Sequence, residues 1–159
     1  MAEQETGQDK KRDERQFVVF GLDKETYGIN ISQVKEIINM QELTAVPKSA
    51  EYIKGIINLR GKVIPVFDLA GKFGLAAKPA TKSTRIIVIE VRDLTVGIIV
   101  DAVSEVLRIS SEVIEPPSGI LVTDISEHFI EGIAKCADCL VIILNLDNAL
   151  VAADFEIAV

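Results

Sequence analysis

One β-rich unit occurs twice in this chain, and the duplication limits the possible folds more than any other feature of the sequence. A shift of 69 positions aligns residues 17–38 with residues 86–107 without a gap, and six of those 22 pairs are identical. A shift of 77 positions aligns residues 53–69 with residues 130–146, again without a gap. Because both alignments follow the same order along the chain, we interpret them as duplication of one strand–strand–helix–hairpin unit.

The first copy predicts the elements of that unit. Strands over residues 17–22 and 27–31 are separated by a turn. Ser32 is a favourable helix N-cap, and the apolar residues that follow are spaced as one face of a short helix that ends near Asn39. A β-hairpin over residues 53–69 completes the unit.

The composition favours a β fold built on aliphatic side chains. Hydrophobic residues make up 48% of the sequence, aromatic residues only 5%, and tryptophan is absent. The core must therefore consist of Ile, Val and Leu, and β-branched side chains favour sheet over helix. Many short strands with tight turns are typical of small barrels, so two units predict a mainly β protein with two barrels packed face to face.

The net charge and the distribution of apolar residues limit the kinds of partner and the compartment that we expect. The net charge is −7, and no basic run lies in the body of the chain, so we expect no nucleic-acid partner. No apolar N-terminal segment or stretch of membrane-spanning length is present, and two cysteines fit a reducing compartment. The sequence therefore predicts a cytoplasmic protein without direct membrane insertion.

The N-terminal segment differs from the rest of the chain. Residues 1–16 carry nine charges and no apolar cluster. Such a segment cannot bury enough surface to offset the entropy lost on ordering. We expect residues 1–16 to be a disordered lead and residues 17–159 to form the folded domain.

The residues needed for catalysis are not grouped in this sequence. His128 is the single histidine, and we interpret it as a surface or loop residue rather than a phosphotransfer site. Residues 71–74 lack both the spacing and the Ser/Thr of a phosphate-binding P-loop. We expect no enzyme, no metal site and no cofactor.

Cys136 and Cys139 form a C-x-x-C pair. The duplication places the pair at a hairpin turn opposite residues 59–62, whereas a redox motif is expected at the start of a helix. A zinc site would need two more ligands, with His128 and nearby carboxylates as the available groups. We interpret the cysteines as small residues near a β-turn, and redox or metal chemistry stays open as the alternative.

Arg60 has no counterpart in the second copy, where Ala137 takes its place. The other hairpin closes without an arginine, so the turn itself does not require one. A guanidinium at a hairpin tip could be a solvated surface group or an anchor for a partner carboxylate. Sequence reasoning alone leaves both interpretations open.

Four motifs together resemble the CheW-like coupling proteins of bacterial chemotaxis. They are F-V-V-F-x-L-x-x-E-x-Y-G-I-x-I (residues 17–31), V-x-E-I (34–37), K-G-I-I-N-L-R-G-x-x-I-P-V-x-D-L (54–69) and V-G-I-I-V-D-A-V-S-E-V-L (96–107). The resemblance implies two five-stranded SH3-like barrels in pseudo-duplicated tandem with short helices. It also implies that residues 17–159 form two intertwined barrel subdomains.

The same resemblance implies a non-enzymatic adaptor. CheW-like proteins link the cytoplasmic tips of methyl-accepting chemoreceptors to the histidine kinase CheA, whose regulatory domain is itself CheW-like. In the family, receptor helices dock between the barrels and the kinase domain docks at a barrel end. Carried over by position, the partner-binding residues are Val34, Glu36 and Arg60, with Lys54 and Asn58 as neighbours.

Two alternatives accompany this prediction. One is a CheW-like adaptor of another chemosensory array that controls surface motility or another output. The other, from a different class, is a thiol- or metal-responsive regulator that uses Cys136 and Cys139. A coupling protein fused to a receiver domain is disfavoured because the sequence ends at Val159.

Overall fold

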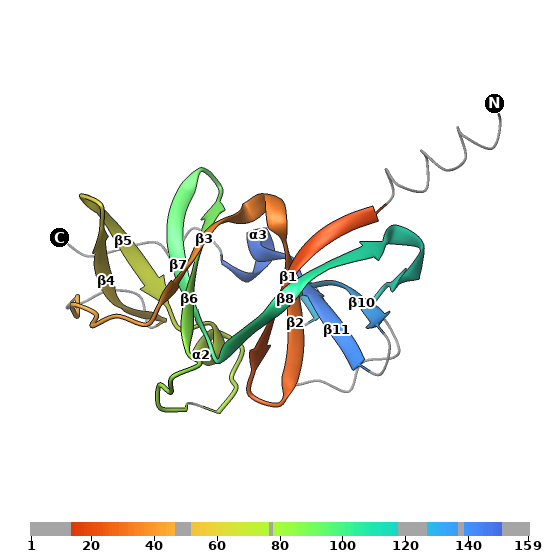
Figure 1. The fold of residues 1–159 in the computed structure, drawn as a ribbon, viewed down its shortest axis with the longest axis horizontal. Coiled ribbons are helices and arrows are strands. Elements are labelled where there is room, and N and C mark those ends of the chain that lie inside the picture. Colours follow the sequence, from red (N-terminus) through yellow and green to blue (C-terminus); the bar gives the residue numbers. More distant parts are fainter. Residues whose placement is uncertain (1–13, 47–51, 77, 118–126, 137–138, 151–159) are drawn as a thin grey trace.

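The computed structural model describes residues 14–46, 52–76, 78–117, 127–136 and 139–150. In this part of the chain the strands form two sheets, accompanied by short helices (Figure 1). The elements are β1 (Glu14–Leu22), β2 (Glu25–Asn30), η1 (Ile31–Gln33), β3 (Val34–Asn39), β4 (Ile53–Leu59), β5 (Lys62–Phe67), α2 (Leu69–Lys72), β6 (Arg85–Val91), β7 (Leu94–Val100), β8 (Ala102–Ser110), η2 (Ser111–Val113), β9 (Ile114–Glu115), η3 (Glu127–Phe129), β10 (Ile130–Cys136), β11 (Cys139–Leu144) and α3 (Leu146–Ala149).

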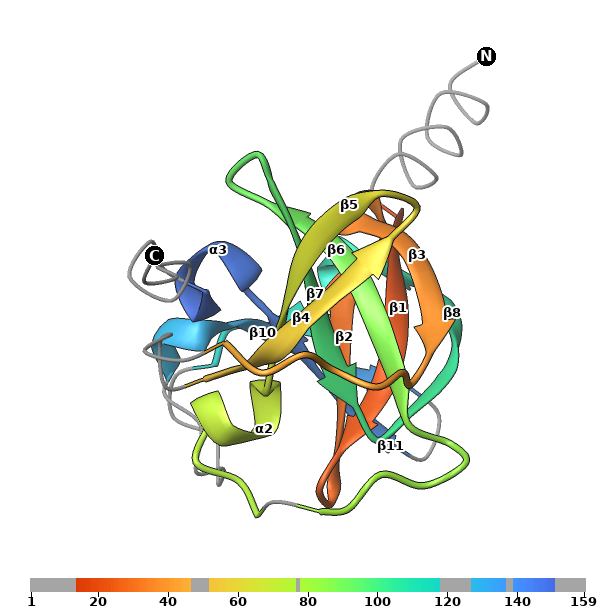
Figure 2. The same cartoon turned by 90° about the vertical axis from the view of Figure 1, so that its left-hand side faces the viewer.

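Each sheet curls into a small SH3-like barrel. The first barrel has the strand order β3-β6-β7-β5-β4, and the second has the order β8-β1-β2-β11-β10-β9 (Figures 1 and 2). The second barrel gains a sixth strand because the two-residue strand β9 pairs with β10. The mainly β fold class with two small barrels and short helices is therefore confirmed.

Both barrels combine strands from the two sequence copies. Strands β1 and β2 come from the first copy but lie in the second barrel, beside β8 and β11. Strands β6 and β7 come from the second copy but lie in the first barrel, beside β3 and β5. Because of this exchange, neither copy of the unit builds a barrel from its own strands alone.

The duplication extends to local backbone geometry. The 69-residue shift places β1–β2 onto β6–β7, and the 77-residue shift places β4–β5 and α2 onto β10–β11 and α3. Register shifts also occur at equivalent points. One pair falls at Lys35 in β3 and Ser104 in β8, and the other at Lys54 in β4 and Glu131 in β10. Matched bulges of this kind are local features that a repeated unit carries into both barrels.

The short helix predicted from Ser32 to Asn39 is wrong. The N-cap is Asn30 rather than Ser32, and its side-chain oxygen accepts the Ser32 N–H at 3.0 Å. Only the single 3-10 turn η1 follows that cap. The chain then continues as β3, which pairs antiparallel with β6 along its length.

The helix-like spacing in β3 arises because its apolar side chains face three different environments. Val34 packs against the core between the barrels, and Ile38 packs against the interior of the first barrel. Ile37 is 41% exposed. The bulge at Lys35 interrupts the simple alternation of a strand, so the pattern imitates a helix.

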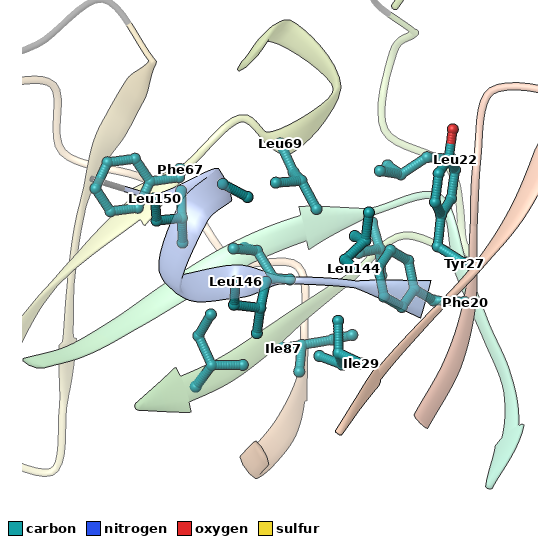
Figure 3. Close-up of a cluster of buried hydrophobic side chains, with 14 of the residues drawn as sticks. Phe20, Leu22, Tyr27, Ile29, Phe67, Leu69, Ile87, Leu144, Leu146 and Leu150 are labelled. Atoms are coloured by element: carbon teal, nitrogen blue, oxygen red, sulfur yellow. The ribbon is translucent and has the colours of Figure 1, made fainter. Parts of the chain in front are cut away.

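The described residues form three apolar cores. The largest lies between the barrels, and Figure 3 shows Leu146 and Leu150, at α3, among side chains from both of them. Each barrel also has its own interior core. Strand β1 serves two cores, because Phe17 and Val19 face the second barrel while Val18 and Phe20 face the core between the barrels. Burial on both faces explains the continuous apolar run in β1.

Strand β1 begins at Glu14, so residues 14–16 are ordered although they were predicted to belong to a disordered lead. They pair with residues 108–110 of β8. Arg15 forms an ion pair with Glu131 of β10, and its guanidinium lies 4.9 Å from the centroid of the Phe17 ring. These contacts order charged residues that composition alone assigns to the lead. Residues 1–13 lie outside the described part of the chain.

Candidate partner-binding site

The β4–β5 hairpin holds Arg60 at its tip. Leu59 pairs with Lys62, so Arg60 and Gly61 form a two-residue turn. Both have positive φ, 51° and 86°, as a type I′ turn requires. The Asn58 side chain accepts the Gly61 N–H at 2.9 Å. Asn58 therefore stabilises the turn that presents Arg60.

Arg60 forms an ion pair with Glu36 of β3. Its Nη2 donates to Glu36 Oε2, and this hydrogen bond together with the opposite charge raises the pKa of Arg60. The Arg60 side chain is 70% exposed and that of Glu36 is 30% exposed. The pair is therefore open to solvent, with Arg60 the more accessible member.

The ion pair crosses the seam of the first barrel, which is the gap between its edge strands β3 and β4. In the strand order of the sheet these two strands lie at opposite ends. The backbone of Thr44, just beyond β3, closes the seam further along through reciprocal hydrogen bonds with Ile56 of β4, at 3.0 and 2.8 Å. The Arg60–Glu36 contact thus adds a side-chain closure at the hairpin tip.

Val34 lies two residues before Glu36 and has a different environment. It is half-buried and packs against the core between the barrels. Lys35, at the bulge between them, directs its Nζ to Thr95 Oγ1 at 3.1 Å and to Glu90 at 3.7 Å. The V-x-E segment therefore anchors Val34 in the core and directs Glu36 toward Arg60.

Lys54 does not lie beside Arg60 and Glu36. It lies at the other end of β4, and six residues of extended strand span about 20 Å. Its Nζ lies 3.7 Å from Asp68 Oδ2, and both residues line a cavity of about 270 Å³ that Leu22 and Asp101 also border. The structure thus brings together Asn58, Arg60 and Glu36 but not Lys54.

Sequence reasoning missed two exposed apolar side chains near the hairpin. Ile37 follows Glu36 on β3, and Val63 pairs with Asn58 across the hairpin and is 64% exposed. Val63 and Leu94 line a groove of about 340 Å³ between β5 and β7. The sequence of Lys62–Phe67 could have predicted the exposure of Val63. Side chains alternate between the two faces of a strand, so an inward-facing Ile64 implies an outward-facing Val63.

These exposed positions recur in the second barrel. Val106 is the counterpart of Ile37 and is 50% exposed, and Leu140 is the counterpart of Val63 and is 53% exposed. Because the unit is duplicated, the same outward-facing strand positions carry apolar side chains in both barrels. The arginine distinguishes the two barrels, because position 60 is Arg and its counterpart 137 is Ala.

The remaining candidate groups lie away from the Arg60 hairpin. His128 belongs to η3, and its carbonyl oxygen accepts from Asn148 Nδ2 at 3.1 Å. Cys136 and Cys139 are free thiols at the end of the β10–β11 hairpin. Across the described ranges, no three His, Cys, Asp or Glu side chains gather as a metal site would need. Within the same ranges no helix has the length and apolar character to cross a membrane.

The pattern of the CheW-like domain family matches residues 16–154, which is most of the chain. The chain belongs to the CheW-like family. Chemotaxis protein CheW of Bacillus subtilis is 40% identical over 136 residues, covering 84% of this chain and 85% of that protein. Chemotaxis protein CheW of Rhizobium meliloti is 31% identical over 144 residues, covering 91% and 92%.

A solved structure agrees with this assignment. The crystal structure of the scaffolding protein TtCheW from Thermoanaerobacter tengcongensis shares 43% sequence identity with this chain. The two folds match with a TM-score of 0.80 over 89% of this chain and 91% of that one. The CheW-like resemblance and its fold are therefore confirmed, whereas the partner-binding roles of the individual residues stay predictions.

Proposed function

We propose that this CheW-like protein is a non-enzymatic adaptor that links chemoreceptors to the histidine kinase CheA. Its relatives in Bacillus subtilis and Rhizobium meliloti are named chemotaxis proteins, and its structural relative is described as a scaffolding protein. The observation that carries the proposal is the exposed ion pair between Glu36 of β3 and Arg60, which lies on a hairpin whose duplicate has no arginine. A residue that the fold can omit in one copy is free to serve a partner in the other.

The adaptor works through geometry rather than chemistry. The large core between the barrels joins them through side chains from both, so surfaces on the two barrels keep a fixed relation. Two partners bound to one rigid body meet at a high effective concentration. The cytoplasmic tip of a methyl-accepting chemoreceptor and the CheW-like regulatory domain of CheA are the partners we assign.

Arg60 is the proposed anchor of one partner interface. Its guanidinium offers several donors, and Glu36 engages one of its terminal nitrogens. A partner carboxylate can therefore pair with the remaining donors while Glu36 holds the side chain in place. Asn58 positions the turn, and Val34 fixes the strand that carries Glu36.

Lys54 is assigned to a separate part of the binding surface. It lies at the base of the hairpin beside Asp68, at the cavity that residues of both barrels border. A partner that reaches both Lys54 and Arg60 would have to extend along the whole of β4. We place the protein in the cytoplasm, where it would be recruited to membrane-bound receptor arrays.

A sedimentation experiment tests the bridging role. Receptor cytoplasmic fragments anchored on vesicles are mixed with CheA, with and without this protein, and the pelleted kinase is measured. Bridging predicts that CheA pellets efficiently only when the adaptor is present. If the folded protein leaves the pelleted fraction of CheA unchanged, the proposed function is wrong for these partners.

A further inference from the structure

The adaptor function leaves the C-x-x-C pair unexplained. Cys136 is the last residue of β10 and Cys139 is the first residue of β11, and the register pairs them directly. Side chains of directly opposed residues in an antiparallel pair lie on the same face. Both thiols therefore lie on one face at the end of the second barrel's hairpin.

The backbone spacing at this position suits a disulfide. Directly opposed residues in an antiparallel ladder have Cα atoms about 4.5–5.5 Å apart. Disulfides join Cα atoms that are roughly 4.4–6.8 Å apart. The Cys139 thiol also donates to the Cys136 carbonyl oxygen at 3.2 Å, so Cys139 Sγ already lies toward Cys136. A bond between the two sulfurs needs no large backbone movement.

The two thiols differ in their access to solvent. Cys139 is exposed, whereas Cys136 is half-buried and packs against the interior core of the second barrel. A small oxidant can therefore reach Cys139 first, while Cys136 stays shielded but adjacent. An accessible thiol that a disulfide reagent can reach, with a second thiol adjacent to it, meets the conditions of access and proximity for intramolecular exchange.

We propose that Cys136 and Cys139 form a reversible intramolecular disulfide when the protein meets a low-molecular-weight disulfide. The Cys139 thiolate attacks one sulfur of that reagent, forming a mixed disulfide and displacing one thiolate. The Cys136 thiolate then attacks the Cys139 sulfur and displaces the second thiolate. The protein loses two protons and two electrons, and the reagent leaves as two thiols.

This disulfide is confined to one barrel. The counterparts of Cys136 and Cys139 in the first barrel are Leu59 and Lys62, which cannot form it. Oxidation therefore links the ends of β10 and β11 and leaves the Arg60–Glu36 pair unchanged. The inference rests on the register and the thiol contact, so it stands or fails independently of the proposed adaptor function.

Oxidation of the full chain by glutathione tests the proposal. Folded protein is equilibrated with increasing ratios of oxidised to reduced glutathione, quenched with acid, alkylated and measured by intact mass spectrometry. The expected product is a monomer lower in mass by two hydrogen atoms, with no alkylated cysteine and no attached glutathione, and dithiothreitol reverses it. Cys136→Ser and Cys139→Ser are matched controls, in which the remaining thiol gives only alkylated or glutathione-bound protein.

Two results would overturn the proposal. One is that the folded wild-type protein gives only glutathione adducts or disulfide-linked dimers over the whole range of ratios. The other is that the internal disulfide forms only after the protein has melted, as judged by circular dichroism on the same samples. Either result would show that the hairpin geometry does not permit the bond.

Discussion

The guanidinium of Arg60 and the carboxylate of Glu36 form an ion pair across the seam of the first barrel, between its two edge strands. One member lies on a hairpin tip and the other on a strand 24 residues earlier in the sequence. An exposed ion pair adds little to stability, because solvent and salt screen it. The pair therefore matters more because it holds the exposed guanidinium of Arg60 at the surface than because it keeps the barrel closed.

Arg60→Glu is expected to weaken partner binding while the fold stays intact. The substitution places two carboxylates where a cation and a carboxylate now meet, so a partner carboxylate is repelled. We expect the Kd for the regulatory domain of CheA or for a receptor fragment to rise by roughly tenfold or more. Titration calorimetry measures the affinity, and the melting temperature of each variant reports on the fold.

A charge swap separates the two possible roles of Arg60. In the double variant Glu36→Arg, Arg60→Glu, the internal ion pair is restored with its polarity reversed. If Arg60 is the partner anchor, affinity stays low in the double variant. Recovery of affinity by the swap, or a lowered melting temperature with unchanged affinity in Arg60→Glu, would show that the arginine is structural.

Gly55→Ala is expected to destabilise the first barrel because its Cβ has no space. A Cβ at this position would lie 2.7 Å from the Thr44 carbonyl oxygen and 2.9 Å from Leu43 Cβ. The backbone bridge that closes the seam would have to shift, at a cost of about 1–3 kcal/mol in the free energy of unfolding. Gly21→Ala is the matched control, since no atom lies within 4 Å of its added Cβ. Equal denaturation midpoints for the two variants would contradict this account of Gly55.

Phe20→Ala is expected to weaken both barrels together. Phe20 is fully buried in the core between them, and removal of such a side chain costs about 3–5 kcal/mol (Figure 3). Because that core includes side chains of both barrels, urea unfolding should show one transition, displaced to lower concentration. Val106→Ala, at a position 50% exposed, should cost less than about 1 kcal/mol. Two separate transitions, with only one of them displaced, would show that the barrels unfold independently.

Alkaline pH is expected to reduce the contribution of Cys136 to stability. Burial raises the pKa of Cys136 above its ordinary value of 9.0, and the charges of Cys139 and Glu105 add to that effect. The folded state therefore holds this proton more tightly than the unfolded state does. The resulting stabilisation is complete below the ordinary pKa and is lost as pH rises through the raised one.

Denaturant unfolding of the reduced protein, from about pH 7 to about pH 10, measures this loss. The stability of the wild type should fall more steeply at the alkaline end than that of Cys136→Ser. Serine removes the titrating group, so the comparison depends on the slopes and not on the absolute stabilities. Parallel curves for the two proteins would show that the Cys136 environment does not favour the thiol.

The duplication made the class of fold predictable from the sequence. Pairs such as Val19 and Val88 mark equivalent strands, and the aliphatic composition made barrels the natural arrangement for them. The exchange of strands could not be derived from the repeat, since an alignment does not say whether β1 pairs with β3 or with β8. The bulge at Lys35 likewise made a strand look like a helix, because it shifted the positions of the apolar residues.

The candidate residues could be named from the sequence, but their arrangement could not. The missing counterpart of Arg60 singled that residue out, and the family motif added Glu36. Their contact is a tertiary feature that depends on how the barrel closes. Lys54 and Arg60 are near in sequence, but the extended strand β4 separates them in space. The exposure of Ile37 and Val63 could not be predicted without knowing which face of each strand turns outward.

Kinase activity in a reconstituted mixture tests the central claim most directly. Autophosphorylation of CheA is measured with receptor cytoplasmic fragments, first without this protein, then with the wild type and with Arg60→Glu. The account predicts strong activation that requires all three components, and a marked loss of it with Arg60→Glu. Kinase activity that is the same with and without the folded wild-type protein would contradict the adaptor function.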